Sequence, residues 1–210
     1  RRGRLRIPIA AEHDVPLSLG GAATFQRENV LAAMAAAYVQ GMRYDDIRAG
    51  LLSFHPSPST TPGRLNVIRM GGSRVVIDYA HNAAAIKGLT ELVFRMPAAK
   101  RYCVLTVPGD RRDGDIREAG RLCAKFDRVI LKEDTDRRGR AEGEIAALLT
   151  EGLVAGGLSP SAIEVKYEEN EAINCGLDLL RVDDLLVIHA DKVPATLAVV
   201  RERAVQRGEG

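Results

Sequence analysis

The sequence predicts an α/β fold in which a mostly parallel, Rossmann-like sheet carries helices on both faces. From residue 64 onward, short apolar runs alternate with segments of helical periodicity, as in strands joined by crossover helices. The apolar runs are unbroken, which is typical of parallel strands buried on both faces. The chain has 210 residues, 46% of them apolar, so it can fill the core of one large domain or of one and a half.

The N-terminal part has a different pattern, in which helices dominate. Residues 1–20 alternate weakly between apolar and polar side chains and predict one or two edge-like strands with turns. Helices are expected at residues 26–40, with Thr24 as a candidate N-cap, and at about residues 43–52. Residues 56–63 are expected to be a linker, since this proline-rich stretch suits neither a helix nor a central strand.

The C-terminal part, residues 64–205, contains the predicted sheet. Strands at residues 65–70 and 74–77 flank Gly71 and Gly72, which is a hairpin signal. Further strands are expected at residues 102–107, 128–131, 163–166 and 185–188. Helices are expected at about residues 84–95, 115–125, 141–152, 169–180 and 193–203.

The composition excludes several classes of function. The 30 basic residues nearly balance the 28 acidic ones, and there is no tryptophan, so nothing favours a nucleic-acid partner. No apolar run is long enough to span a membrane. The three cysteines, Cys103, Cys123 and Cys175, predict buried free thiols in a reducing cytoplasm, and their spacing suits no zinc site, so no metal ligands are expected.

Four polar turns follow predicted strands, where open α/β sheets bind ligands. They are residues 78–82, 108–115, 132–140 and 189–192. Each turn alone could be an ordinary charged loop, and Asn82 could simply cap the helix that follows it. Four such turns together indicate a binding site at the carboxyl edge of the sheet.

Three motifs occur in order along the chain: residues 20–33 (GGAATFQRENVLAA), 61–66 (TPGRLN) and 78–82 (DYAHN). Together they resemble the Mur ligase superfamily of ATP-dependent, amide-forming ligases. The resemblance implies that residues 1–55 end a central ATPase domain and that residues 64–205 form the C-terminal domain. No Gly-x-x-x-x-Gly-Lys-Ser/Thr phosphate loop is present, so we expect an upstream domain to hold most of the Mg²⁺–ATP site and the isolated chain to be inactive.

The resemblance also implies the contacts to ATP. In the family, the arginine of Pro-Gly-Arg and the aspartate of Asp-x-Ala-His contact ATP, and here these are Arg64 and Asp78. A guanidinium donates bidentately to phosphate, and a carboxylate accepts from ribose hydroxyls. Asn82 and Asn29 are further nucleotide-binding candidates, although both could equally be polar residues at a helix start.

Two residues are candidates for a catalytic role. His81 could flank the adenine or position the acceptor, although a lone histidine in a turn is often structural. Lys192 stands where muramyl ligases carry a Gly-Lys-Gly-His-Glu motif and could touch phosphate or the acceptor carboxylate, or be a surface lysine.

The choice of amino acid is expected to depend on Arg111 and on residues 134–137. These match Gly-Asp-Arg and Asp-Asn-Pro-Arg, with which the diaminopimelate-adding members hold the incoming amino acid. Here Asp134, Asp136 and Arg137 follow Glu133, and the additional carboxylate suits a guanidinium.

We therefore expect arginine as the amino acid and an acidic polymer as its acceptor, since residues 20–33 most closely resemble the branch of the superfamily that joins arginine to poly-aspartate. A muramyl-peptide or folylpolyglutamate type of ligase remains an alternative. So does a non-catalytic module that binds a nucleotide or an amino acid, and the sequence leaves homo-oligomerisation open.

Overall fold

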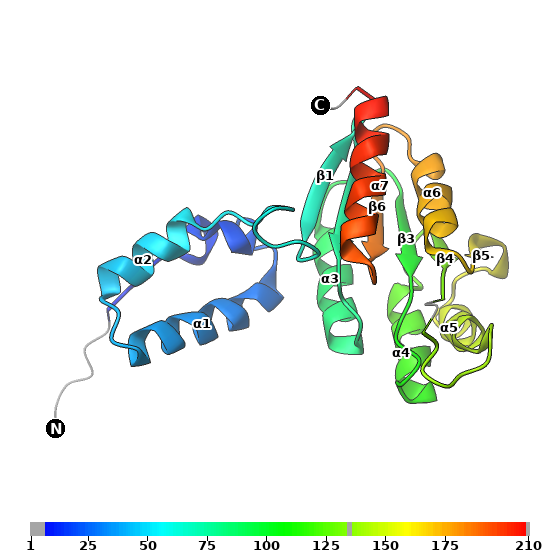
Figure 1. Ribbon diagram of the computed structural model, residues 1–210, viewed down its shortest axis with the longest axis horizontal. Helices are drawn as coiled ribbons and strands as arrows, with labels where there is room; N and C mark the ends of the chain where they lie inside the picture. Colours follow the sequence, from blue (N-terminus) through cyan, green and yellow to red (C-terminus); the bar gives the residue numbers. More distant parts are fainter. Residues whose placement is uncertain (1–6, 134–135, 209–210) are drawn as a thin grey trace. The chain divides into compact units, whose positions relative to one another are not determined.

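The computed structural model describes residues 7–133 and 136–208 and divides the chain into two compact units, residues 1–56 and 57–210 (Figure 1). The first unit contains α1 (Thr24–Val39) and α2 (Tyr44–Ser53), preceded by the single-turn helices η1 (Glu12–Asp14) and η2 (Pro16–Ser18). The two predicted helices are confirmed within a few residues. That this unit ends a central ATPase domain stays a prediction.

Two expectations for the first unit are wrong. Residues 7–20 form no strand, because Pro16 lacks an N–H and the Ser18 hydroxyl donates to the Glu12 carbonyl at 2.6 Å, which folds the segment back on itself. Thr24 is the first residue of α1 and not its N-cap; Ala23 stands at that position and makes no side-chain hydrogen bond.

The second unit is built on a six-stranded sheet with the order β1-β2-β6-β3-β4-β5. β1 pairs antiparallel with β2, and the other four pairings are parallel, so the predicted mostly parallel sheet is confirmed. The strands are β1 (Asn66–Met70), β2 (Ser73–Asp78), β3 (Arg101–Leu105), β4 (Arg128–Leu131), β5 (Ile163–Val165) and β6 (Leu185–His189).

β6 lies in the middle of the sheet although it comes last in the chain. It pairs with β2 on one side and with β3 on the other, and all five of its residues are buried. This position explains why β6 is an apolar run rather than an alternating one. It also brings the turn after β6 between the turns that follow β2 and β3.

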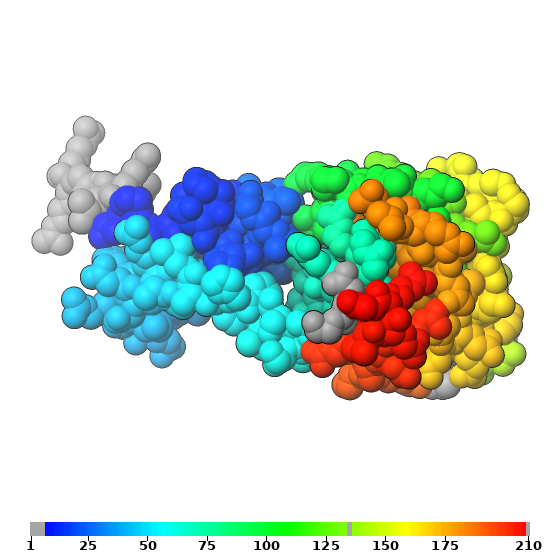
Figure 2. Space-filling model, turned by 90° about the horizontal axis from the view of Figure 1, so that it is seen from above, coloured from blue at the N-terminus to red at the C-terminus, as the bar shows by residue number. Residues whose placement is uncertain are grey.

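Helices cover both faces of the sheet, as predicted (Figure 1). α6 (Glu169–Leu179) and α7 (Val193–Gln206) pack on the face to which Val75, Val104 and Ile188 point. Figure 2 shows the atoms of α7 in red beside those of α6 in orange. The opposite face carries α3 (Ala83–Arg95), α4 (Asp113–Cys123) and α5 (Glu144–Ala155), and the short η3 (Pro160–Ala162) leads into β5.

α4 and α5 approach each other closely. A Cβ atom placed on Gly152 of α5 would lie 2.0 Å from the backbone oxygen of Arg117 in α4, so only glycine fits at this crossing. Arg117 then pairs with Glu151, with 2.6 Å between Nε and Oε2. Among the described residues, no helix is both long and apolar enough to cross a membrane.

Candidate functional site at the carboxyl edge of the sheet

Two adjoining hollows lie at the carboxyl edge of the parallel strands. The first lies over the ends of β2, β3 and β6, and its lining includes Tyr79, Thr106, Arg138 and Asp191. The second, about 210 Å³ in volume, lies beside the first turns of α3 and α4 and is lined by Asn82, Arg111, Asp115 and others. His81 and Val107 line both hollows.

The structure therefore brings three of the predicted site residues together: His81, Asn82 and Arg111. A further hollow of about 300 Å³ lies elsewhere, in the first unit. Most of its lining is aliphatic, and none of the predicted site residues contributes to it, so it supplies no chemistry to the carboxyl edge.

Asp78 ends β2 as a buried carboxylate that organises the neighbouring loop. Its Oδ2 accepts a hydrogen bond from the backbone N–H of Leu65 at 2.8 Å. Burial raises the pKa of Asp78, against the opposing effect of the Leu65 N–H, of the Ala80 N–H and of the nearby His189 and Arg64. Asp78 thus holds the loop that carries Arg64, a task that sequence reasoning did not assign to it.

The loop of residues 61–66 depends on a glycine. Gly63 has a φ of +68°, and a Cβ atom there would lie 2.5 Å from a methyl carbon of Val193. The Gly63 N–H donates to Asn66 Oδ1 at 2.7 Å, and its carbonyl accepts from the Tyr79 N–H at 2.8 Å. The loop is therefore fastened to the turn that follows β2.

Arg64, Tyr79 and His81 lie in a row at this edge. The exposed guanidinium of Arg64 lies 5.4 Å from the centre of the Tyr79 ring, and the centres of the Tyr79 and His81 rings are 4.8 Å apart. Sequence reasoning missed Tyr79, whose aromatic side chain lies between two candidate residues.

Of the other candidates from the sequence, Asn82 and Lys192 occupy N-cap positions, and Asn29 lies in the second turn of a helix. Asn82 is the N-cap of α3, and its side chain accepts from the Ala85 N–H at 2.9 Å, which confirms the capping interpretation. Lys192 is exposed at the N-cap position of α7. Asn29 lies in α1 of the first unit, where it donates to Gln26 Oε1 at 2.9 Å. Their roles toward a ligand stay predictions.

The loop after β4 uses part of its charge within the chain. Glu133 is buried and accepts from the N–H groups of Gly143 and Ala146, both at 3.0 Å, so it stabilises the N-terminus of α5. Arg137 lies with its Nε 3.4 Å from Glu133 Oε2 and also pairs with Glu142. Both oxygens of Glu133 thus accept hydrogen bonds at the start of α5, and Glu133 is not an additional carboxylate for a ligand.

Two acidic candidates remain in this loop. Asp136 is exposed, accepts from the backbone N–H of Arg138 at 3.1 Å and also pairs with the Arg138 guanidinium, with 3.1 Å between Oδ2 and Nε. Asp134 lies outside the described residues. Arg138 also reaches Asp110, with 3.2 Å between its Nη1 and Oδ2, so the loops after β3 and β4 touch through their charges.

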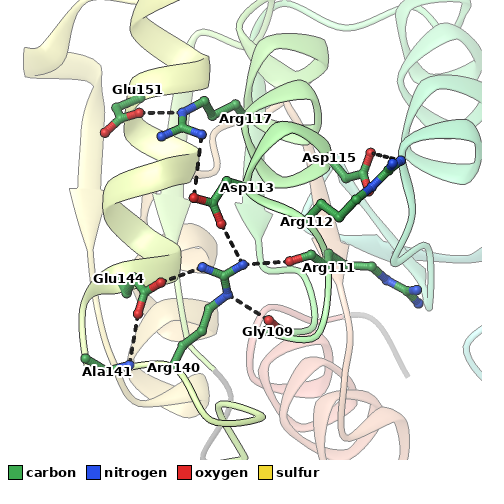
Figure 3. A network of polar contacts seen from close by, with 10 residues as sticks. All are labelled: Gly109, Arg111, Arg112, Asp113, Asp115, Arg117, Arg140, Ala141, Glu144 and Glu151. Atoms are coloured by element: carbon green, nitrogen blue, oxygen red, sulfur yellow. Dashed lines mark hydrogen bonds and ion pairs between the residues drawn. The ribbon is translucent and has the colours of Figure 1, made fainter.

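Arg140 is the strongest connection between these two loops, and sequence reasoning missed it (Figure 3). Its largely buried guanidinium donates to the carbonyls of Gly109 and Arg111, both at 2.7 Å, and pairs with Asp113 and Glu144. The two carboxylates raise the pKa of Arg140. Arg140 thereby holds the backbone of Arg111 at the edge of the second hollow.

Comparisons with known proteins agree with this architecture. Residues 63–191 match the family described as Mur ligase, glutamate ligase domain. The chain is 39% identical over 203 residues to a cyanophycin synthetase of Trichormus variabilis, covering 96% of this chain and 22% of that protein. It is 30% identical over 133 residues to a UDP-N-acetylmuramoyl-L-alanyl-D-glutamate–L-lysine ligase of Streptococcus suis, covering 62% of this chain and 26% of that one.

Solved structures share the fold at lower identity. Escherichia coli FolC in complex with ADP aligns with a TM-score of 0.61 at 23% identity, over 87% of this chain and 40% of that one. The MurF ligase of Thermotoga maritima in complex with ADP aligns with a TM-score of 0.59 at 19% identity, over 87% and 39%. The chain spans about a fifth of the length of the curated cyanophycin synthetases it matches. The match over residues 63–191 shows that this chain belongs to the Mur ligase family, through its glutamate ligase domain.

Proposed function

We propose that this chain is the C-terminal part of an ATP-dependent ligase that adds arginine to the aspartate side chains of an acidic polymer. The observation that carries the proposal is the 39% identity to a cyanophycin synthetase over 96% of the chain, which includes the residues of the carboxyl edge. The joining of a carboxylate to an amine would proceed through transfer of the terminal phosphoryl group of ATP to the carboxylate. The amine would then displace phosphate from the acyl phosphate.

The residues of this chain would bind and orient the reactants. Arg64 is exposed on a loop fastened by Asp78, so its guanidinium can reach a phosphate oxygen without reorganising the loop. The Tyr79 ring, which packs against the tilted ring of His81, offers an aromatic face beside it for a base. Arg111, at the second hollow, supplies a positive charge for the carboxylate of the amino acid.

The described residues do not fit a magnesium site of their own. Mg²⁺ prefers oxygen ligands, usually carboxylates together with water. Asp78 is already used by the Leu65 N–H, and the one close group of three possible ligands among the described residues contains sulfur and nitrogen donors. We therefore assign no magnesium ligand to residues 7–133 and 136–208.

The choice of amino acid would depend on the loop after β4. A guanidinium needs a carboxylate partner, and Asp136 is an exposed carboxylate of the described part of this loop. Losing one charged hydrogen-bond partner costs about 1.5–3 kcal/mol, roughly ten- to a hundredfold in affinity.

The experiment measures amide formation by the polypeptide that contains this chain together with its phosphate-binding domain. The amino acids offered are arginine, lysine, diaminopimelate and glutamate, with a poly-aspartate primer or a muramyl-peptide acceptor. We expect arginine and the primer to be used, and Asp136→Asn to raise the KM for arginine while the KM for ATP stays unchanged. Asp183→Asn is the matched control, because Asp183 is exposed at the other end of β6 and has a φ of +67°, which asparagine tolerates.

Two results would contradict the proposal. Preference for diaminopimelate or lysine with a muramyl acceptor would assign the chain to a muramyl ligase. No ATP-dependent product with any pair would favour a binding module.

A further inference from the structure

A buried cluster beneath the carboxyl edge has no role in the proposed reaction. Within residues 7–133 and 136–208, Cys103, Cys123 and His189 form the one group of three or more cysteine, histidine and acidic residues that can offer its ligand atoms to a single ion. These atoms all lie within 4.8 Å of one another, and all three residues are buried.

The topology explains how residues far apart in the sequence meet here. Val104 and Ile188 point to the face covered by α6 and α7, so their neighbours Cys103 in β3 and His189 in β6 point to the opposite face. Cys123 is the last residue of α4, which packs on that opposite face. Because β6 is inserted beside β3, the imidazole reaches the two sulfur atoms.

The histidine is oriented as a ligand would be. Its Nδ1 lies 3.0 Å from the carbonyl oxygen of Ala80, which can only accept a hydrogen bond, so Nδ1 carries the proton. Nε2 is then a bare lone pair, buried beside the Cys123 sulfur and bonded to no oxygen or nitrogen atom of the described residues. In a metal-binding histidine, the ring nitrogen that does not bind the metal usually donates a hydrogen bond to a backbone carbonyl or a carboxylate, which fixes the orientation of the ring.

We propose that Cys103, Cys123 and His189 bind one zinc ion in the core of this domain. Two thiolates and a neutral imidazole are ligands that zinc prefers, and the two negative charges cancel those of the ion, so no net charge is buried. Two sulfur atoms on a tetrahedral zinc lie roughly 3.8 Å apart, so the donors need to close by no more than about 1 Å. Thr90 of α3, whose buried hydroxyl lies beside Cys123, offers an oxygen for a fourth position.

Binding would be balanced by proton release. Each thiol loses one proton to solvent as its sulfur binds, so one zinc ion displaces two protons, and no oxidant or reductant takes part. The ion would join β3, α4 and β6 and would fix the imidazole that holds the Ala80 carbonyl. It would therefore act as a structural ion beneath the turn that carries His81.

The test titrates the reduced, chelator-treated chain with zinc chloride and, separately, with cadmium chloride. We expect one equivalent of either ion per chain, release of two protons, and a cadmium–thiolate charge-transfer absorbance. Cys123→Ser and His189→Gln should each weaken zinc binding by at least about 10–100-fold. Removing a residue that only hydrogen-bonds to a metal ligand already causes a loss of that size. Cys175→Ser is the matched control and should bind as the parent does, because Cys175 lies in α6 on the other face.

A second measurement needs no variant and so does not depend on how the variants fold. At a urea concentration at which the metal-free chain exposes its buried thiols to alkylation, zinc should protect two of the three cysteines, and mass spectrometry should identify them as Cys103 and Cys123. Absence of a saturable equivalent, equal protection of Cys175, or binding that survives both Cys123→Ser and His189→Gln would overturn the proposal and leave an adventitious ion only.

Discussion

Replacing Asp78 with alanine tests whether this carboxylate organises the loop of residues 61–66. The substitution leaves the buried N–H of Leu65 without the acceptor that it has at 2.8 Å. An unsatisfied buried donor costs about 1–3 kcal/mol, so the free energy of unfolding should fall by that amount. Asp78→Asn keeps an oxygen for Leu65 and removes a charge whose burial is unfavourable, so it should be at least as stable as the parent at neutral pH.

The assay is urea-induced unfolding of the chain, followed by circular dichroism, with the parent and both variants measured at one temperature. The order of stability expected is alanine below the parent, and asparagine equal to the parent or above it. If the alanine variant were as stable as the asparagine variant, the Leu65 hydrogen bond would contribute nothing and our account of this loop would be refuted.

Four further predictions concern Asp78, Gly152, Arg140 and the isolated chain. Burial raises the pKa of Asp78, so the folded chain binds a proton at this carboxyl more tightly than the unfolded chain does. The contribution of Asp78 to stability is therefore greatest below its unfolded pKa, near 4, and falls as the pH rises through its folded pKa. The free energy of unfolding of the parent minus that of Asp78→Asn should rise on acidification, and a difference that does not change with pH would contradict the shift. Gly152→Ala should lower the free energy of unfolding by about 1–3 kcal/mol, because its Cβ meets the Arg117 carbonyl; Gly114→Ala, at a position with open space, is the control, and equal stabilities would show that the crossing is looser. In the complete ligase, Arg140→Ala should raise the KM for the amino acid, because Arg111 loses its support, and leave the KM for ATP unchanged; a change in the ATP value alone would assign Arg140 to the nucleotide. The isolated 210-residue chain should form no amide from ATP, arginine and primer, since it has no phosphate loop, and a measurable product would show this wrong.

Much of the fold could be predicted, because hydrophobic periodicity and turn residues such as glycine and proline are signals within short stretches of sequence. The Gly71–Gly72 hairpin and the alternation of strands and helices follow from neighbouring residues, and the structure confirms them. The central position of β6 could not be predicted, because strand order depends on contacts between distant segments. Of the region expected to form strands, residues 1–20, residues 1–6 lie outside the described part, and residues 7–20 form no strand because weak alternation does not outweigh Pro16 and the turn that Ser18 closes.

The candidate site shows the same division. The carboxyl edge could be predicted, because ligand sites of parallel sheets lie there. The ion-pair and hydrogen-bond partners of individual charged residues could not be predicted. Glu133 looks like a free carboxylate in the sequence, yet the fold places it against the N-terminus of α5. Arg140 looks like one basic residue among several, and only the approach of two loops reveals its four partners.

The proximity of two cysteines to His189 could not be predicted for a related reason. Spacing along the sequence reveals a metal site only when its ligands come from one or two local segments. Here Cys103, Cys123 and His189 come from a strand, a helix end and another strand, and register alone brings them together.

The central claim is that the carboxyl edge holds the nucleotide through Arg64, and the most direct measurement is the KM for ATP of the complete ligase carrying Arg64→Gln. Arg69→Gln is the matched control, because Arg69 is an exposed arginine of β1 outside both hollows. Losing a charged hydrogen bond costs about 1.5–3 kcal/mol, so Arg64→Gln should raise the KM roughly ten- to a hundredfold, while Arg69→Gln leaves it unchanged. Equal KM values for both variants and the parent would contradict the claim.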